Sequence, residues 1–153
     1  MKDKDFINKP VVSMKDGAKI GTVKDLVFRG VDLVSLVVDG ERGEGLLPFE
    51  CVNESGPDAV MIEDVAGVAW NSGLYLEPGT RNAHDLKLLS VVDAEGNNLG
   101  RIHDFTMNAK GRMQKLFVRT EGVFGIGSHE QEVPESRIRA IGPDMITVDM
   151  PRK

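Results

Sequence analysis

The side chains best suited to acid–base or metal chemistry are scattered along this chain. The three histidines, His84, His103 and His129, have no second histidine at the spacing of a metal site. His129 opens the segment His-Glu-Gln-Glu, which lacks the second histidine of a zinc-binding helix and falls in an expected strand. His103 corresponds to Lys24 in the repeat described below, so its position suits a long polar group facing solvent. The pattern predicts no metal site and no cofactor.

Two aspartates, Asp25 and Asp104, are the most informative polar pair. Each stands among apolar residues at the same place in two similar segments. A carboxylate there can accept backbone N–H groups where a strand bends. Catalysis would instead need two carboxylates facing one cleft, and two copies in two separate units do not converge naturally. We therefore expect both aspartates to be structural.

Two glycine-rich segments, residues 40–45 and 122–127, resemble phosphate-binding loops only superficially. Neither has the spacing of a P-loop or of a dinucleotide fingerprint. We expect both to be loop tips. Val123, Phe124 and Ile126 make the second tip apolar, which indicates either contact with a protein partner or cover for the sister unit or a second copy.

The nucleophile candidates add no reaction centre. The serines at 90, 128 and 136 lack the glycine-flanked elbow of a hydrolase. Cys51, the single cysteine, follows Pro48 in an apolar stretch and is expected to be a small buried hydrophobe. We expect no catalytic residues and no enzymatic activity.

The chain carries one pattern twice, near residues 11–63 and 89–149. Gly17 and Gly21 correspond to Gly96 and Gly100, 79 positions later, and Pro48 corresponds to Pro134 at an offset of 86. The offset grows only where glycine and polar residues cluster, so the insertions fall in loops. A duplicated small domain follows, with units at 6–64 and 86–150 and a linker at 65–85 that packs on the barrels.

Strand signals dominate both copies, and short apolar runs are bounded by Gly, Asp and Asn. Gly21 and Gly100 fall inside long second strands, where an interior glycine marks a bulge or sharp bend. Such a bend lets one strand serve both sides of a small barrel. Trp70 is expected to fill a gap between the units. The expected strands cover residues 11–14, 19–29, 33–39, 45–48, 59–63, 88–92, 98–108, 112–121, 130–133 and 145–149, with helical turns at 49–53 and 135–138 and a short helix at 64–70.

Charge and composition limit the partners. The net charge is −5, divided into −6 over residues 1–85 and +1 over residues 86–153. An acidic chain is poorly suited to tracking phosphates, which disfavours nucleic acid and favours a protein partner. The apolar runs are too short to span a bilayer, and no export signal is visible. With one cysteine, these features predict a cytoplasmic protein, either free or held at a membrane through a partner.

Each unit resembles the PRC-barrel domain, with glycine and aspartate punctuating apolar strands. The first unit departs from the family pattern at its opening, where Ser13 or Met14 stands in place of an acidic residue. The matching residues are Gly17, Gly21, Val23, Asp25, Pro48, Gly56, Asp58 and Ile62 in the first unit, and Asp93, Gly96, Gly100, Ile102, Asp104, Pro134, Gly142, Asp144 and Val148 in the second.

The resemblance implies an all-β fold of two tandem, strongly bent β-barrels related by pseudo-twofold symmetry, with little helix. Members of the family look like interaction modules, found in the photosynthetic reaction-centre H subunit and in a ribosome maturation factor that binds a ribosomal protein. The family shares no catalytic residues, so none carries over.

The function expected from these features is a non-enzymatic protein-interaction or assembly module, with a homodimer left open. One alternative is an accessory factor in ribosome or RNA maturation, because the second unit has a basic bias. Another is a small-ligand carrier that uses the cleft between the barrels near Trp70. The basic bias comes from Arg112, Lys115, Arg119, Arg137 and Arg139.

Overall fold

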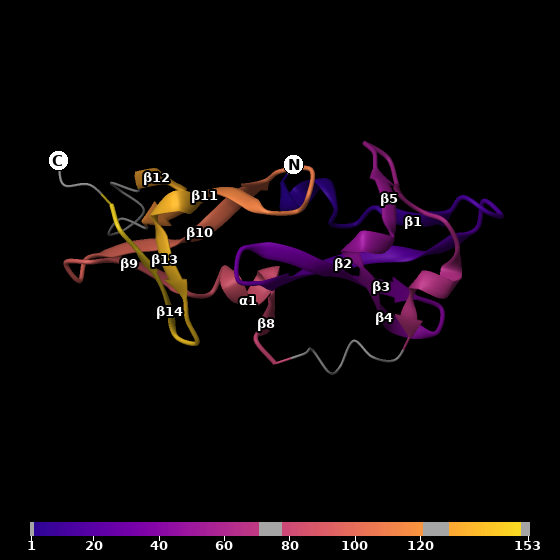
Figure 1. Cartoon of the computed structure of the whole chain (residues 1–153), viewed down its shortest axis with the longest axis horizontal. Helices are drawn as coiled ribbons and strands as arrows, with labels where there is room; N and C mark the ends of the chain where they lie inside the picture. Colours follow the sequence, from indigo (N-terminus) through magenta and orange to yellow (C-terminus); the bar gives the residue numbers. More distant parts are fainter. Residues whose placement is uncertain (1, 71–77, 121–128, 151–153) are drawn as a thin grey trace. The chain divides into compact units, whose positions relative to one another are not determined.

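The computed structural model describes residues 2–70, 78–120 and 129–150. The chain divides into two compact units, residues 1–83 and residues 84–153. Each unit is built on a sheet of its own (Figure 1). The expected all-β architecture of two tandem units with little helix is confirmed.

The first unit has an eight-stranded sheet of order β5-β6-β1-β2-β3-β4-β7, with β8 paired on β2. Neighbouring strands are antiparallel except β1 and β6, which run parallel. The strands are β1 (Pro10–Ser13), β2 (Lys19–Arg29), β3 (Asp32–Gly40), β4 (Gly43–Pro48), β5 (Val52–Ser55), β6 (Val60–Ile62), β7 (Ala69–Trp70) and β8 (Thr80–Asn82), and the short 3-10 helices are η1 (Asp3–Asp5), η2 (Phe49–Cys51) and η3 (Val65–Gly67).

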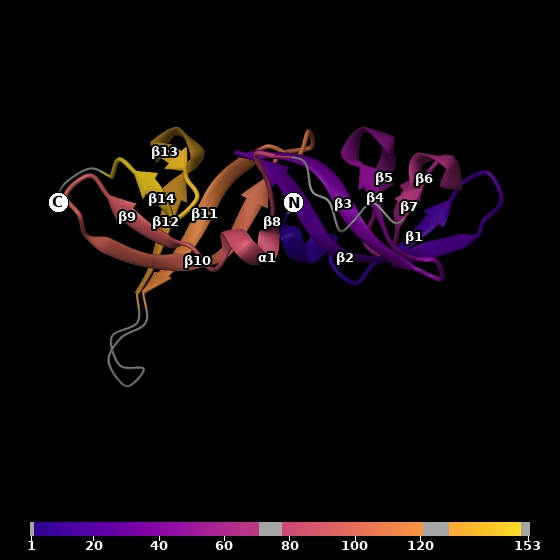
Figure 2. The ribbon, with the colours of Figure 1, turned by 90° about the horizontal axis from the view of Figure 1, so that it is seen from below.

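The second unit has a six-stranded sheet of order β12-β11-β10-β9-β14-β13. This order repeats β4-β3-β2-β1-β6-β5 of the first unit, including the parallel pair, here β9 and β14. Figure 2 shows β10 and β11 as two long bent ribbons side by side. The elements are α1 (Ala83–Leu86), which begins at the boundary of the units, β9 (Ser90–Asp93), β10 (Asn98–Met107), β11 (Met113–Thr120), β12 (His129–Pro134), η5 (Glu135–Arg137), β13 (Ile138–Ile141) and β14 (Met145–Val148).

The ten expected strands are all present, with ends that differ by a few residues, and the helical turns after Pro48 and Pro134 are η2 and η5. The short strands β5, β7, β8 and β13 and the helix α1 were not expected. Residues 64–70 form η3 and β7 instead of a short helix, with the side chain of Asp64 capping η3. The segment expected to be a linker thus adds β7 and β8 to the first sheet.

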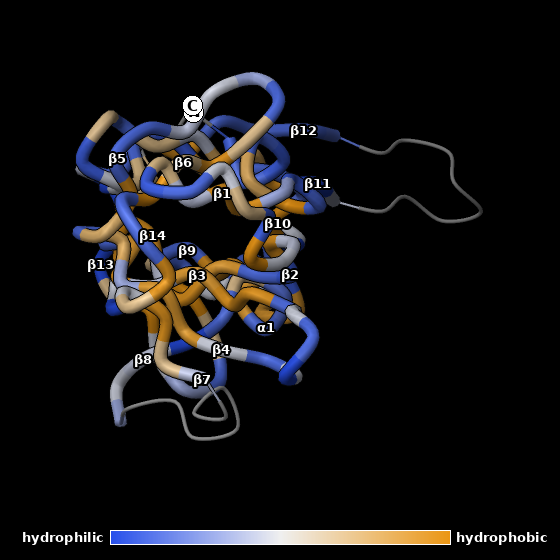
Figure 3. The backbone as a smooth tube through the Cα atoms, turned by 90° about the vertical axis from the view of Figure 1, so that its right-hand side faces the viewer, coloured by the Kyte–Doolittle hydropathy of each residue, from blue (hydrophilic) through white to orange (hydrophobic). Residues whose placement is uncertain are grey.

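The two cores use corresponding side chains. Val11, Leu36 and Leu47 of the first unit are fully buried, as are their counterparts in the second. Figure 3 shows a hydrophobic stretch along β3, the strand that carries Leu36. Phe6 adds a buried ring to the first core, and its centroid lies 6.4 Å from that of Phe49 in an edge-on contact. The counterparts in the second unit are Val91, Leu116 and Val133.

Gly21 and Gly100 lie where a neighbouring strand passes too close for a side chain. A Cβ atom at Gly21 would lie 2.5 Å from the carbonyl oxygen of Asp39. At Gly100 it would collide with the carbonyl oxygen of Arg119, and the backbone there has a φ of 113°. Each glycine also lies at a register shift between the first and second strands of its unit. The bend expected from the interior glycines is therefore a β-bulge with close backbone contact.

Gly100→Ala is expected to lower the free energy of unfolding by roughly 2–5 kcal/mol, because a left-handed backbone and a steric collision add. Gly96→Ala is the matched control, since Gly96 has a φ of 85° but no atom within 4 Å of the added Cβ. It should cost about 1–2 kcal/mol. Urea unfolding followed by circular dichroism compares the two, and equal losses would contradict the collision.

Candidate interaction surface

Asp25 and Asp104 hold a second bulge in the long strands of their units. The pairing of β2 with β3 shifts register between Val23 and Asp25, so Lys24 is the extra residue. His103 has the same place between Ile102 and Asp104 in β10. The Asp25 Oδ1 accepts a hydrogen bond from the Leu26 N–H at 2.8 Å. The Asp104 Oδ1 accepts one from the Phe105 N–H at 2.9 Å, and Asp104 is 5% exposed.

The bulged residues themselves face solvent, as the sequence predicts for His103. The Lys24 Nζ lies 2.5 Å from the Glu44 Oε1, and the hydrogen bond and charge of Glu44 raise the pKa of Lys24. The two aspartates are committed to backbone amides and the exposed lysine to a neighbouring carboxylate. These contacts stabilise the bulged conformation of the strand.

Asp104→Ala is expected to destabilise the chain by about 1–3 kcal/mol, because it leaves the buried Phe105 N–H without this acceptor. Asp104→Asn keeps an oxygen at that place and should cost less than half as much. Urea unfolding of the two variants beside wild type measures the difference. Equal losses for Ala and Asn would show that the charge, and not the acceptor, matters.

The turn that enters β10 depends on Asp93. Its Oδ1 accepts hydrogen bonds from the N–H groups of Glu95 at 3.0 Å and Asn97 at 2.9 Å. The hydrogen bonds from Asn97 lower the pKa of Asp93 below its ordinary 3.8. The first unit has Ser13 at the corresponding strand end, and there Asp16 takes the role by accepting from the Ala18 N–H, which lowers the pKa of Asp16. This accounts for the missing acidic residue at the opening of the first copy.

Because the folded-state pKa of Asp93 is lowered, its carboxylate stabilises the fold above the ordinary pKa, and this contribution is lost as the pH falls through the lowered value. Asp93→Ala should therefore lower the thermal midpoint around neutral pH, and its gap to wild type should narrow below about pH 4. Asp93→Asn has no carboxyl group to titrate at this position, so its thermal midpoint should change less with pH in the acid range than that of wild type. A gap that stays constant with pH would contradict this role.

Each unit has a groove beside its glycine bulge, where the third strand ends. The groove of the first unit has a volume of about 440 Å³, and Lys19, Arg42 and Trp70 are among the residues that line it. The Trp70 ring lies over Gly40 and Gly45, where an added Cβ would meet it at 2.7 and 2.8 Å. The structure thus places Trp70 on the β3–β4 hairpin of its own unit.

The groove of the second unit has a volume of about 460 Å³ and is polar. Its lining includes Asn98, Arg101, Arg119 and Thr120. The Thr120 hydroxyl donates to the Leu99 carbonyl at 2.6 Å, and the Asn98 Oδ1 accepts from the Gly100 N–H at 2.9 Å. These side chains suit hydrogen bonding and charge recognition, and no nucleophile is paired with a base among them.

The comparison with known families agrees with this fold. The PRC-barrel domain model matches residues 1–69 and again residues 78–153. The chain belongs to the PRC-barrel family, as a tandem member. PRC-barrel domains are interaction and assembly modules. No curated protein matches the chain.

The described part of this PRC-barrel protein has neither a metal cluster nor a membrane-spanning helix. Within residues 2–70, 78–120 and 129–150, no group of three or more His, Cys, Asp or Glu side chains is placed to hold a metal ion. Across the same ranges, no helix has both the length and the apolar character needed to cross a membrane.

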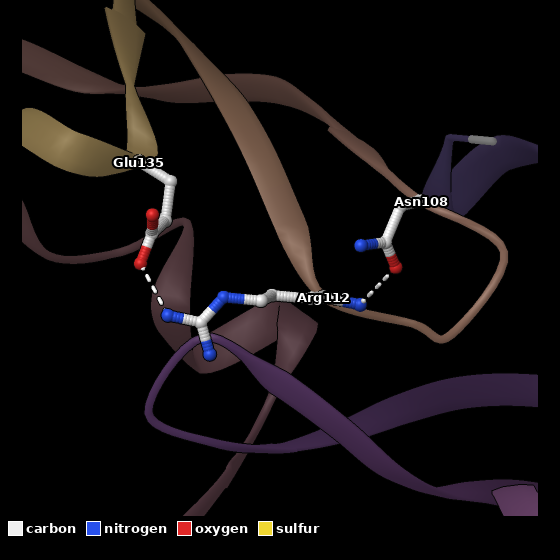
Figure 4. A network of polar contacts seen from close by, with 3 residues as sticks. All are labelled: Asn108, Arg112 and Glu135. Carbon is white, nitrogen blue, oxygen red and sulfur yellow. Dashed lines mark hydrogen bonds and ion pairs between the residues drawn. The ribbon is translucent and has the colours of Figure 1, made fainter.

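The five basic residues that gave the second PRC-barrel unit its bias each have an acidic or carbonyl neighbour. The Arg112 guanidinium lies 2.6 Å from the Glu135 carboxylate, and the backbone N–H of Arg112 donates to the Asn108 Oδ1 at 3.0 Å (Figure 4). Local neutralisation of this kind weakens the field that a phosphate backbone would need. The other pairs are Lys115 with Glu132 at 3.6 Å, Arg119 with Glu130 at 3.3 Å, Arg139 with Asp149 at 3.7 Å, and Arg137 with the Asp149 carbonyl at 3.5 Å.

The apolar tip formed by Val123, Phe124 and Ile126 lies outside the described residues, so it stays a prediction from the sequence. Cys51 is half-buried beside Gly67, so it is less buried than the sequence predicts. Sequence reasoning also missed β12 as a surface. Its signal was the polar run from His129 to Glu132, at the place where the first unit has Gly-Glu-Gly-Leu.

Proposed function

We propose that this tandem PRC-barrel protein is a non-enzymatic protein-interaction or assembly module. The observation that supports this proposal is what the polar side chains contact. Asp25 and Asp104 are bound to backbone amides inside the bulges, and the described residues that line the grooves are charged, hydrogen-bonding and, in the first unit, also apolar. Such surfaces are suited to binding a partner. The single cysteine fits action in a reducing compartment such as the cytoplasm.

The charges support a protein partner over RNA. The chain has a net charge of −5. All five basic residues that gave the second unit its bias lie within 4 Å of an acidic side chain or a carbonyl oxygen. Phosphate recognition needs lysine and arginine side chains that can displace counterions, and paired side chains do this poorly. A folded or extended protein segment needs only local complementarity.

The tagged full chain should recover the same protein partners from cell extract with and without nuclease treatment. Phe124→Asp with Ile126→Asp should reduce that recovery, because charges on an apolar tip disfavour burial at an interface. The matched control is Met14→Asp, since Met14 is an apolar side chain with 59% exposure in the first unit. Quantitative mass spectrometry of the eluates and light scattering of each bait provide the measurement.

The outcomes separate the alternatives. Unchanged partners and unchanged molecular mass for the double variant would remove the tip as a contact. Loss of all partners after nuclease treatment would favour RNA and contradict the protein-interaction proposal. Recovery of no protein beyond that found with an empty bait would also contradict the protein-interaction proposal.

A further inference from the structure

The two sheets differ at one corresponding edge. In the first unit β7 pairs antiparallel with the outer edge of β4, placing Trp70 opposite Gly45 and Ala69 opposite Leu46. In the second unit β12 corresponds to β4, and it is the terminal strand of the described sheet. Within the described residues, β12 pairs with β11 on one side only. The first copy therefore shows how a strand sits on an edge that, among the described residues of the second copy, has no strand paired to it.

The residues of β12 differ from the corresponding residues of β4 in the first unit. The pairing with the third strand of each unit shows which edge residues correspond. Val38 pairs with Gly45, and its counterpart Val118 pairs with Gln131, so Gly45 corresponds to Gln131. In the same way Val37 pairs with Leu46 and Phe117 pairs with Glu132, so Leu46 corresponds to Glu132. Gln131 stands at the position where Gly45 leaves room for the Trp70 ring in the first unit. Its Oε1 is buried and has no hydrogen-bond partner among the described residues. A strand that covers this edge is expected to bring a hydroxyl or amide donor to Gln131.

On the exposed face of this edge, basic side chains on β11 lie beside acidic side chains on β12. On β11 these are Lys115 and Arg119, and on β12 they are Glu132 and Glu130, with pair distances of 3.6 and 3.3 Å. These four side chains are 47–61% exposed, and β12 begins hydrophilic in Figure 3. Opposite charges on adjacent strands stabilise a sheet, and like charges directly opposite destabilise it. The next strand in this series therefore suits basic side chains.

The same charges argue against a second copy of β12 as the occupant. Antiparallel self-pairing centred on Gln131 would place Glu130 of one chain opposite Glu132 of the other. Acidic side chains at an exposed edge are a common barrier to such self-pairing. At the carboxyl end of β12, Pro134 has no N–H to donate and so limits the length of edge that can pair.

We propose that the outer edge of β12 binds an extended segment of a partner protein by antiparallel strand addition. The segment carries Lys or Arg on the face of Glu130 and Glu132, and Thr, Ser or Val on the opposite face. Main-chain hydrogen bonds to the edge supply affinity, and the alternating side chains supply specificity. This inference rests on the proposed function and gives it a binding mode and a partner chemistry.

The probe is the synthetic peptide Lys-Val-Lys-Thr-Lys-Thr, with blocked ends, added to the full ¹⁵N-labelled chain. Read antiparallel, it sets Val opposite Val133, Lys opposite Glu132, Thr opposite Gln131 and Lys opposite Glu130. We expect amide shift changes and slowed hydrogen exchange that centre on His129–Pro134. A peptide with Glu in place of Lys tests charge. A peptide with Pro in place of Val and the first Thr keeps the charge and removes the strand.

The protein variant is Glu130→Lys with Glu132→Lys, which should weaken the basic peptide by roughly tenfold or more. Glu135→Lys is the matched control. It also breaks an ion pair, with Arg112 at 2.6 Å, but Glu135 lies in η5 beyond the edge. The control should bind within about twofold of wild type, as expected for a charge outside the contact. Overlay of the amide spectra shows that each variant is folded.

Several outcomes would overturn strand addition at β12. These are no response to the basic peptide, equal responses to the proline or acidic peptides, changes centred on another element, or a dimer in light scattering that Glu130→Lys with Glu132→Lys abolishes. If the extract partners survive that double variant while the peptide fails, the edge proposal falls and the interaction module stands. If no partner is recovered by any bait, the proposed function itself fails.

Discussion

The close approach of backbone to backbone at Gly21 and Gly100 is the constraint from which both sheets follow. A carbonyl of the third strand occupies the space where a side chain would start, so the second strand must bend there and leave its partner's register. A few residues later Asp25 or Asp104 binds a backbone amide at the next bulge. Together these two features let one long strand pair with β1 and β3, or β9 and β11, while it changes direction.

Duplication preserved this interior and relaxed the periphery. The buried positions correspond across the copies, as with Leu36 and Leu116, because a mismatch in the core would cost several kilocalories per mole. The edges carry no such penalty. The first copy has β7 and β8 in addition, while in the second copy the strand that corresponds to β4, which is β12, is charged. The two halves therefore share a scaffold and present different surfaces.

Much of the fold could be predicted from the sequence, because paired glycines, aspartates and apolar runs recur at nearly constant offsets. The bulges were predictable for the same reason, since a glycine inside a strand commonly marks a bulge or a close approach of backbone. The strands β5, β7, β8 and β13 were not. Polar residues interrupt β5, β8 and β13, and β7 has only two residues, whereas the equally short β6 is a continuous apolar run. The surface at β12 was missed because the sequence predicts a strand at 130–133 but not which of its edges lacks a partner, which depends on the neighbouring strands.

The placement of Trp70 has a practical consequence. It is the single tryptophan of the chain, and its ring rests on Gly40 and Gly45 in the β3–β4 hairpin. Intrinsic fluorescence thus observes only the amino-terminal unit, whereas ellipticity sums over both. Superposing the two signals during denaturation would tell whether the halves melt together or in turn, with no label attached.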